Sequence, residues 1–326
     1  MKTELLQMLR ESEDYLSGQE LCTKLQVSRT AVWKAICSLR EDGYEIEAAA
    51  GKGYRLTGVP DSIAAEEVSS ILKTRWVGRP VCYYSEITST NLYAKQMAEE
   101  GAKEGLLVIA DSQTRGRGRL GRSWTTPPGT AIAMTLMLRP NLPPERISMV
   151  TLVMGMAVAE ACRDLYGIDA GIKWPNDVVV DGRKLCGILT EMSAEISAVN
   201  YIVIGTGINA NVRAFPPELE NTATSLVRCL GHEVNRARLI AQVMLRFEEY
   251  YEAFLKAGGL TPLRERYQQL LVNCGRAVRV LQPDGDYTGT ALGIDDSGRL
   301  LVQKEDGTVT GIYAGEVSVR GVYGYI

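Results

Sequence analysis

The chain has 326 residues, of which 45% are hydrophobic and 23% charged, with a net charge of −3; this composition is typical of a globular protein of two or three domains. The weak negative charge excludes a uniformly basic nucleic-acid binder, so any DNA contact must be local. Seven cysteines lie scattered without a CxxC pair, and the sequence shows neither a signal peptide nor an apolar run as long as a membrane helix. We expect a cytoplasmic protein with reduced cysteines and no membrane contact.

His232 is the single histidine of the chain, and no cluster of carboxylates or cysteines surrounds it in the sequence. A Ser-His-Asp triad or a His-rich zinc site would have to be built on this residue alone. We therefore expect His232 at the surface. We expect any catalysis to depend on lysine, arginine, backbone N–H groups and a metal ion.

Residues 1–60 show the pattern of a winged helix-turn-helix. Apolar residues recur at helical spacing, and two serines stand where a side chain would cap a helix. The expected elements are a helix over Thr3–Arg10, a helix begun by the capping box Ser17-Gly-Gln-Glu20, a helix capped by Ser28 and ended by Gly43, and a hairpin of Tyr44–Ala48 and Tyr54–Thr57 that would be the wing.

Basic side chains gather on the second helix, the third helix and the wing of this segment, although it carries nine acidic and eight basic residues in all. This placement suits phosphate contacts together with a recognition helix in the major groove. A protein-interaction module or a vestigial helical module is the alternative. The candidate DNA-binding residues are Ser28, Arg29, Thr30, Trp33, Lys34, Arg40 and Lys52.

Residues 61–272 predict a mixed α/β domain, and residues 273–326 predict a small closed β-barrel because short strands alternate there with Asp-Gly and Ser-Gly turns. The expected central strands are Val81–Ser85, Leu106–Ala110, Ala131–Leu138, Val178–Val180, Lys184–Thr190 and Ile202–Gly205, and the expected helices are Asp61–Leu72, Asn91–Glu100, Thr151–Leu165 and Arg238–Lys256. The expected barrel strands are Ala277–Leu281, Tyr287–Ile294, Leu300–Lys304, Thr310–Tyr313 and Glu316–Arg320.

Three segments carry candidate chemistry. In Gln113–Trp124, glycines alternate with arginines in a loop between two strands, a pattern that can close over an anion. In Lys173-Trp-Pro-Asn-Asp177, the turn at Asp181-Gly182 brings Lys184 back beside Asp177, which suits a nucleotide triphosphate with Mg²⁺ or, equally, a structural salt-bridged hairpin. The segment Gly205–Asn211 resembles a nucleotide-binding glycine turn, but on its own it is better explained as a plain turn between strands.

Together these segments resemble the biotin–protein ligase family. Ser89–Asn91, the GRGRLGR loop, KWPND, Gly205–Asn211 and Gly315–Arg320 follow the family's order, and the resemblance covers nearly the whole chain. With its N-terminal segment the chain is similar to the bifunctional members, which also repress the biotin operon. The implied fold is an α+β multidomain one: an N-terminal winged helix-turn-helix, a central ligase domain resembling class II synthetases and a C-terminal SH3-like β-barrel.

The resemblance also implies roles for individual residues. The implied catalytic residues are Lys184, Arg119 and Asp177. The implied biotin-binding residues are Ser89, Thr90, Asn91, Gln113, Arg117, Gly118, Arg119 and Lys184, and the implied nucleotide-binding residues are Arg122, Trp124, Lys173, Asn176, Asp177, Asn209 and Arg320.

The implied reaction uses ATP and Mg²⁺ to convert biotin into biotinyl-5′-AMP and then transfers biotin to a lysine of a biotin carboxyl carrier protein or another biotin-dependent carboxylase. The implied partners are this acceptor, operator DNA and a second copy of the chain when the adenylate is bound. Two rivals stay open at this point. One is a transcription factor whose second domain only senses biotin, and the other is a lipoate–protein ligase.

Overall fold

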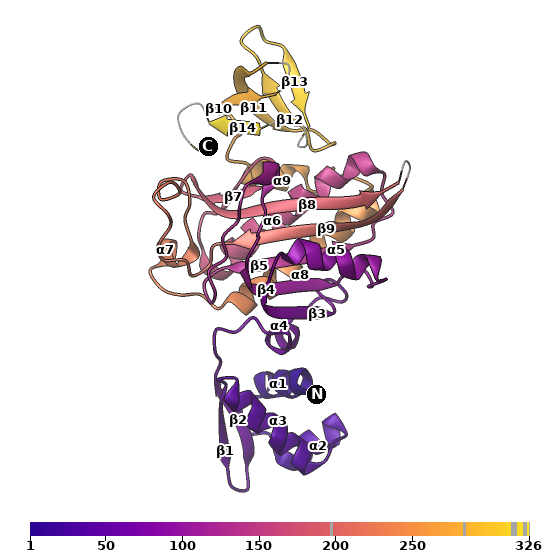
Figure 1. Ribbon diagram of the computed structural model, residues 1–326, viewed down its shortest axis with the longest axis vertical. Helices are drawn as coiled ribbons and strands as arrows, with labels where there is room; N and C mark the ends of the chain where they lie inside the picture. The colour runs from indigo at the N-terminus through magenta and orange to yellow at the C-terminus, as the bar shows by residue number, and fades with distance from the viewer. Residues whose placement is uncertain (196–197, 283–284, 314–317, 322–324, 326) are drawn as a thin grey trace.

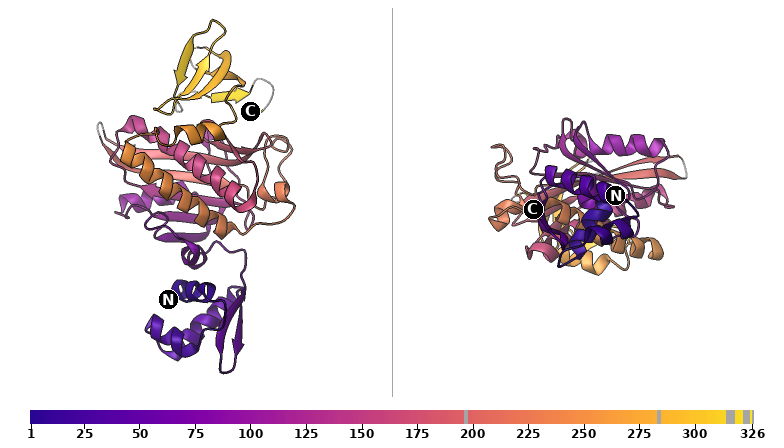
Figure 2. Two further views of the ribbon diagram at one scale, coloured as in Figure 1. Left: turned by 180° about the vertical axis from the view of Figure 1, so that it is seen from behind. Right: turned by 90° about the horizontal axis from the view of Figure 1, so that it is seen from below.

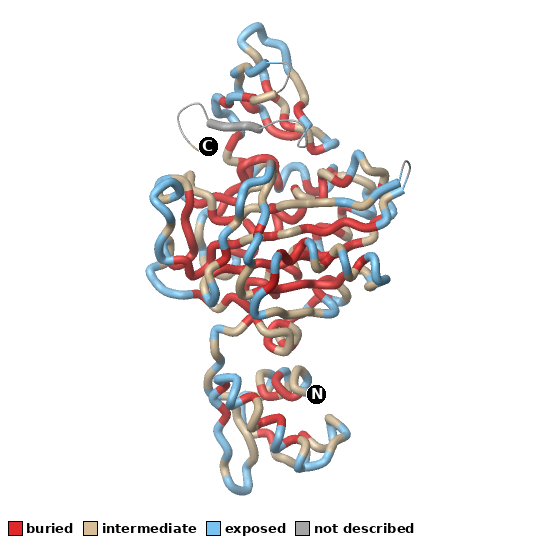
Figure 3. Tube along the Cα trace, in the orientation of Figure 1, coloured by how far each residue is buried: buried red, intermediate tan, exposed pale blue. Residues whose placement is uncertain are grey.

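The computed structural model describes residues 1–195, 198–282, 285–313, 318–321 and 325, with Leu120 and residues 318–321 described by their backbone alone. Three bodies lie one after another along the long axis: the N-terminal helices, a large sheet and the C-terminal strands (Figure 1). Buried residues are concentrated in the middle body (Figure 3). Within the described ranges, no helix is both long and apolar enough to cross a bilayer.

The N-terminal body is a winged helix-turn-helix, as the sequence predicts. Ser17 and Ser28 accept hydrogen bonds from the backbone N–H groups of Glu20 and Ala31, so both predicted helix caps are present. Gly43 has a φ of 93°, in the left-handed region that glycine favours at a helix end. The elements are α1 (Lys2–Glu11), α2 (Gly18–Leu25), α3 (Arg29–Glu41), β1 (Glu45–Ala49) and β2 (Gly53–Gly58).

A buried carboxylate joins the N-terminal body to the middle one. Glu67 lies in α4 (Ala65–Ile71) and is fully buried. Arg10 Nη2 lies 2.5 and 2.6 Å from its two oxygens, and the Tyr44 hydroxyl donates to it at 2.6 Å. Burial of a charge is costly unless it is paired and hydrogen-bonded, so these partners fix α1 and the connection between α3 and β1 against α4.

The middle body contains a seven-stranded mixed sheet in the order β3-β4-β5-β9-β8-β7-β6. Only β3 and β4 pair in parallel; the other neighbours are antiparallel. The strands are β3 (Val81–Ile87), β4 (Leu107–Gln113), β5 (Ile132–Leu138), β6 (Gly171–Lys173), β7 (Asp177–Val180), β8 (Arg183–Ala194) and β9 (Val199–Ile208).

Helices lie on both sides of this sheet. The long helices α6 (Ile147–Tyr166) and α8 (Arg236–Ala257) run side by side in the view from behind, whereas α5 (Thr90–Glu99) lies on the front of the sheet (Figures 1 and 2). Helix α6 is buried along most of its length because the sheet covers one side of it and α8 another. The short segments are α7 (Leu226–Leu230), α9 (Arg264–Leu270), η1 (Arg119–Gly121) and η2 (Pro144–Arg146).

The C-terminal body is a five-stranded antiparallel sheet in the order β13-β12-β11-β10-β14. Among its described residues, the edge strands β13 and β14 do not pair with each other. The strand pairing that would close the predicted barrel is therefore not seen in the described part of the chain. The body docks on the KWPND segment, because the Trp174 indole N–H donates to the Gly298 carbonyl at 3.1 Å. The strands are β10 (Ala277–Leu281), β11 (Tyr287–Ile294), β12 (Leu300–Gln303), β13 (Val309–Ile312) and β14 (Ser318–Gly321).

Some predicted boundaries differ from the structure. The helix expected over Asp61–Leu72 begins only at Ala65, because Asp61 accepts hydrogen bonds from the backbone N–H and the guanidinium of Arg236. The sequence pattern missed β6, α7 and α9, and β8 continues to Ala194, beyond the predicted Thr190. The glycine segment from Gly205 is not a turn, since β9 runs through it to Ile208.

Candidate active site and DNA-binding surface

A pocket lies where the start of α5, the loop after β4, and strands β5, β8 and β9 meet. The pocket brings together most of the residues that the sequence singled out. The predicted residues that line it are Ser89, Thr90, Asn91, Gln113, Arg117, Gly118, Arg119, Trp124, Asn176 and Lys184. Ala133, Met134, Ile188 and Leu189 add apolar surface to the same wall, a composition typical of small-ligand sites.

One part of the pocket is a network of short polar side chains. The Gln113 side-chain oxygen accepts hydrogen bonds from the backbone N–H of Thr90 at 2.8 Å and from its hydroxyl at 3.1 Å. Thr135, which the sequence analysis did not select, lies 2.8 Å from the Thr90 hydroxyl and 2.7 Å from the Asn91 carbonyl oxygen. The sequence signal that could have identified Thr135 is its position as a polar residue within an otherwise apolar predicted strand. The network fixes the direction in which Thr90 and Asn91 present their polar atoms.

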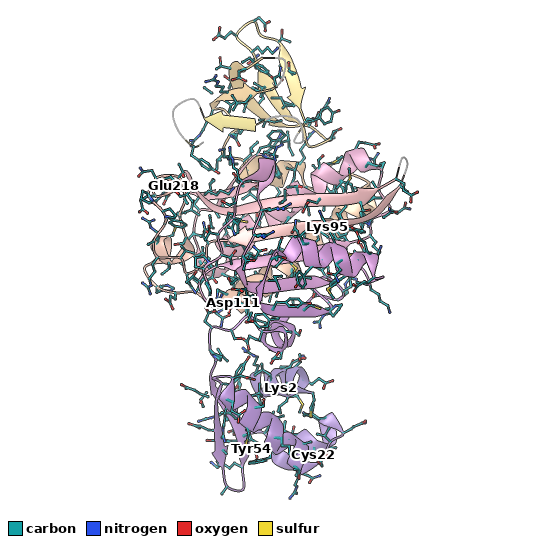
Figure 4. The ribbon with its side chains drawn as sticks, viewed as in Figure 1. Lys2, Cys22, Tyr54, Lys95, Asp111 and Glu218 are labelled. Carbon is teal, nitrogen blue, oxygen red and sulfur yellow. The ribbon has the colours of Figure 1, made fainter. Side chains whose placement is uncertain are left out.

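Glu191 is a second residue that the sequence analysis missed. Its carboxylate accepts a 2.7 Å hydrogen bond from the Asn91 amide and pairs with the Lys95 ammonium at 2.6 Å. Lys95 lies on α5, on the front of the sheet, and is partly buried (Figure 4). Because Asn91 is bound on both its oxygen and its nitrogen, its amide orientation is fixed, and Glu191 acts on the pocket through Asn91.

The glycines of β9 are required by close approach rather than by a turn. A Cβ added to Gly205 would lie 2.2 Å from the Asn91 side chain, and one added to Gly207 would lie 2.4 Å from the Trp124 indole. Both contacts are closer than real Cβ atoms tolerate. The two glycines therefore make room for the polar network on one side and for the Trp124 ring on the other.

The arginine-glycine loop folds into a small hairpin over the pocket. The backbone N–H of Trp124 donates to the Gly116 carbonyl at 2.9 Å, and that of Gly118 donates to Arg122 at 2.7 Å. Arg119 Nη1 donates to the Asn176 side-chain oxygen at 2.9 Å. Burial lowers the pKa of the Arg119 guanidinium, and the charge of Asp177 opposes that shift; an arginine nevertheless stays protonated. The loop thus places a partly desolvated cation beside KWPND.

The KWPND segment converges with Lys184, as the sequence predicts. Asp181 and Gly182 have φ angles of 49° and 74°, which fit the tight hairpin turn between β7 and β8. Lys184 Nζ then lies 2.6 Å from Asp177 Oδ1. The side chains of this pair remain 28% and 15% exposed, so water and ligands can still reach both charges.

The remaining predicted nucleotide residues differ in position. Lys173 is buried at the end of β6, with its ammonium 3.5 Å from the centre of the Tyr325 ring. The buried Asn209 amide donates to the Thr224 carbonyl at 3.1 Å, outside the pocket lining. Arg122 is exposed at the end of the loop hairpin. The backbone of Arg320 lies in β14, and its side chain falls outside the described residues, as do Gly315, Glu316 and Val317.

The donor groups fit a nucleotide-borne Mg²⁺ better than a resident metal centre. Among the described residues, no three His, Cys, Asp or Glu side chains lie close enough to hold a metal ion. Asp177 is nevertheless a carboxylate beside a lysine in the pocket wall. Mg²⁺ that arrives on a triphosphate needs only one or two protein carboxylates, since phosphate oxygens and water complete its shell.

The predicted DNA-binding residues lie on the N-terminal body, far from this pocket. Arg29, Thr30, Trp33 and Lys34 are exposed along α3, with Trp33 56% exposed. Lys52 is exposed at the tip of the β1–β2 hairpin. The Ser28 side chain is the α3 cap, and the Arg40 guanidinium donates to the Ile46 carbonyl at 3.0 and 2.5 Å. Those two residues therefore also hold the third helix and the wing in place.

Comparison with known proteins identifies the family. An HTH domain model matches residues 2–55, the Biotin/lipoate A/B protein ligase family matches residues 82–209, and the Biotin protein ligase C terminal domain matches residues 274–320. The chain is 38% identical to the bifunctional ligase/repressor BirA of Bacillus subtilis over 98% of both chains. It belongs to the biotin protein ligase family. The corresponding BirA of Escherichia coli is 32% identical over 97% of this chain and 96% of its own.

A solved structure of the biotin protein ligase family supports the same conclusion. The biotin protein ligase of Aquifex aeolicus in complex with biotin and ATP matches with a TM-score of 0.65 and 30% identity, over 74% of this chain and 98% of that one. The fold of the catalytic part is therefore that of a biotin ligase. The full-length similarity to bifunctional ligase/repressors extends this to the N-terminal body.

Proposed function

We propose that this chain is an ATP-dependent biotin–protein ligase that also represses genes of biotin synthesis or uptake. The observation that supports the ligase most directly is the pocket that the Thr90 network, the arginine-glycine loop and Lys184 line together, with Asp177 paired to Lys184 beside it. A neutral polar head group and two anions can be bound there together. We also propose that the chain divides into residues 1–60, 61–272 and 273–326, one for DNA, one for catalysis and one for support of the nucleotide site.

Biotin would bind with its ureido ring against Ser89, Thr90, Asn91 and Gln113. Short hydroxyl and amide groups match a neutral ring that both donates and accepts hydrogen bonds. The apolar wall and the Trp124 ring would hold the remainder of the molecule. Arg117, Gly118 and Arg119 would close over it, and Lys184 would meet the biotin carboxylate.

In the first step the biotin carboxylate attacks the α-phosphorus of ATP and pyrophosphate leaves. A carboxylate is already ionised at neutral pH, so this step needs no general base. It needs two anions held in contact, and Lys184 and Arg119 supply positive charge for that purpose. When bound, Mg²⁺ would neutralise phosphate charge, and Asp177 is the residue that would hold it. Trp124, Asn176 and Lys173 would contact the nucleotide.

In the second step a lysine of the acceptor attacks the acyl carbon of the adenylate and AMP leaves. The amine must be neutral, and the usual pKa of lysine is about 10.4, so a nearby group has to take its proton. Asp177 is our candidate for that group. The acceptor would be a biotin carboxyl carrier protein or another biotin-dependent carboxylase.

The repressor half of the proposal rests on the exposed face of α3 and on the tip of the wing. Arg29, Thr30, Trp33, Lys34 and Lys52 would contact operator DNA, with Ser28 and Arg40 supporting them. One recognition helix with little net charge binds DNA weakly, so we propose that a homodimer formed by the adenylate-bound protein is the DNA-binding species.

Exchange of labelled pyrophosphate into ATP tests the ligase assignment. We expect exchange that depends on biotin and is not supported by lipoate at the same concentration. Transfer of biotin to a carboxyl carrier domain tests the second step. Exchange with lipoate alone, or no exchange with either acid, would remove the biotin ligase assignment.

A further inference from the structure

We propose that Tyr325, the residue before the last position of the sequence, is a positioning residue of the nucleotide site: its hydroxyl fixes the Asp177 carboxylate and its ring fixes the Lys173 ammonium. The inference rests on the proposed ligase function and adds to it a contribution from the C-terminal end of the chain. Neither the sequence motifs nor the family comparisons select this tyrosine.

The contacts of Tyr325 are short and involve both ends of the KWPND turn. Its hydroxyl donates to Asp177 Oδ2 at 2.6 Å, and the Lys173 ammonium lies 3.5 Å from the centre of its ring. Lys173 and Asp177 are register partners in the β6–β7 ladder. A single aromatic side chain therefore connects the residue before this turn with the residue after it.

The hydroxyl completes the set of partners around Asp177. Oδ1 of this carboxylate pairs with Lys184 at 2.6 Å and accepts a hydrogen bond from the Asn176 amide at 3.3 Å, whereas Oδ2 takes the Tyr325 hydroxyl. When Lys184 turns to the substrate anions, the hydroxyl still stabilises the carboxylate charge. Without it, Asp177 would compete more strongly with the substrate for the Lys184 ammonium.

Tyr325 acts as a neutral donor in this arrangement. Burial raises its pKa, and the negative charge of Asp177 raises it further. The geometry agrees with a donor role, because the ionised Asp177 carboxylate can only accept the hydrogen bond that joins it to the hydroxyl.

The ring acts on a second group, Lys173, which is only 6% exposed. A cation over an aromatic face is stabilised more strongly when it is desolvated. Trp174 lies between Lys173 and Asp177 in the sequence, and its indole N–H donates a hydrogen bond to the Gly298 carbonyl of the C-terminal body. The C-terminal body thus contacts KWPND through Gly298 and the chain end contacts it through Tyr325.

Two variants separate the hydroxyl from the ring. Tyr325→Phe keeps the ring over Lys173 and removes the hydrogen bond to Asp177, whereas Tyr325→Leu removes both. Tyr313→Phe is the matched control, because Tyr313 is 49% exposed on the C-terminal sheet. The measurements are calorimetric binding of biotin and of a non-hydrolysable ATP analogue with Mg²⁺, the rate of pyrophosphate exchange, and the melting temperature, all with the full chain.

We expect Tyr325→Phe to lower kcat of exchange about fivefold to tenfold with an unchanged dissociation constant for the ATP analogue. We expect Tyr325→Leu to lower kcat similarly and to weaken analogue binding about fivefold. In both Tyr325 variants, biotin binding and the melting temperature should match the wild type. In the control Tyr313→Phe, biotin binding, analogue binding, the exchange rate and the melting temperature should all match the wild type.

Three results would overturn the inference. They are unchanged analogue binding in Tyr325→Leu, faster exchange in either variant, or an equal loss of biotin and analogue binding with a lower melting temperature, which would mean a purely structural role. A wild-type protein that shows no biotin-dependent exchange would instead remove the proposed function, so the two failures are distinguishable.

Discussion

Lys184 and Asp177 lie on facing strands, and their pairing follows from the two-residue turn between β7 and β8. Neither residue is fully buried, which lowers the worth of the pair as a source of stability, since partly exposed ion pairs contribute about 0–1 kcal/mol. The pair is therefore better explained by chemistry than by folding. The ammonium group of a lysine held at this point can turn from Asp177 to an arriving anion without a large rearrangement.

This leads to a prediction for Lys184→Ala. The variant should lose pyrophosphate exchange by about a hundredfold or more, because it removes a preorganised charge from the transition state. The free energy of unfolding should change by less than about 1 kcal/mol. Lys103→Ala, which alters an exposed lysine outside the pocket, should keep wild-type exchange. Wild-type exchange in the Lys184 variant would show that this lysine is not catalytic.

A second residue-scale prediction concerns Arg119→Gly. Arg119 contacts Asn176 from the loop hairpin, so its loss removes charge-assisted hydrogen bonds and loosens the loop over the adenylate. Release of the adenylate should become about tenfold faster, while its synthesis falls less. A chase experiment with labelled adenylate gives the release rate, and labelling of unrelated lysines should rise with it. An unchanged release rate would contradict this role.

At the scale of elements, periodicity and capping predicted most of the helices and strands, because those signals are local. They predicted the N-terminal body well, where Ser17 and Ser28 cap the helices that they begin. The start of α4 was missed because the partner of Asp61 is Arg236, 175 residues away. Local signals contain no information about such a pairing.

The candidate site shows the same difference between local signals, which the sequence contains, and long-range contacts, which it does not reveal. The loop, KWPND and Lys184 were found because each carries its chemistry in a short segment. Thr135, Glu191 and Tyr325 were missed, since each joins the site through a contact with a distant segment. The role of Gly205 and Gly207 was misread as a turn, because their requirement is the space occupied by Asn91 and Trp124, which appears only when the chain is folded.

An element-scale prediction concerns the contact of α8 with the segment before β3. The Glu248 carboxylate accepts hydrogen bonds from the backbone N–H groups of Arg75, Trp76 and Val77. Burial acts to raise its pKa, but the backbone donors outweigh burial, and the pKa lies below its usual value. The folded state therefore favours the ionised form, and this stabilisation is present above the unfolded-state pKa of about 4.3.

We expect Glu248→Gln to lower the free energy of unfolding by about 1–2 kcal/mol at pH 7. The difference from the wild type should shrink as the pH falls below about 4 and through the folded-state pKa, because the wild-type carboxyl is then protonated. Urea unfolding across this pH range measures it. Glu249→Gln, which alters a mostly exposed neighbour, should show a smaller difference at neutral pH. A Glu248 difference that does not vary with pH would refute the electrostatic explanation.

At the scale of the whole molecule, Arg236 connects the linker with the active-site loop. Its buried guanidinium binds Asp61 of the linker at 2.8 Å, Asp111 at 2.7 Å and the Ala131 carbonyl at 3.1 Å. Asp111 precedes the arginine-glycine loop and Ala131 follows it, and Asp111 lies on the side of the middle body that faces the linker (Figure 4). A rearrangement of the arginine-glycine loop can therefore be transmitted through Arg236 to the linker that carries the DNA-binding body.

The last prediction follows from this connection. Closing of the loop over the adenylate would stabilise a self-complementary surface, and coupling energies of about 1–3 kcal/mol are typical of such links. A dimer would place two α3 helices on related half-sites of the operator. We therefore expect biotin with ATP to drive dimerisation and to tighten operator binding about fivefold to 150-fold. Sedimentation and gel shifts, with and without the adenylate, measure both.

The variants for this test separate the two activities. Arg29→Ala and Lys34→Ala should weaken operator binding and leave biotin transfer at the wild-type rate, because both side chains are exposed on α3, far from the pocket. Lys73→Ala, an exposed lysine outside the N-terminal body, is the control. Because the acceptor must reach the same site, unbiotinylated carrier domain should reverse dimerisation. Equal operator affinity with and without the adenylate would leave a ligase whose N-terminal body does not respond to biotin.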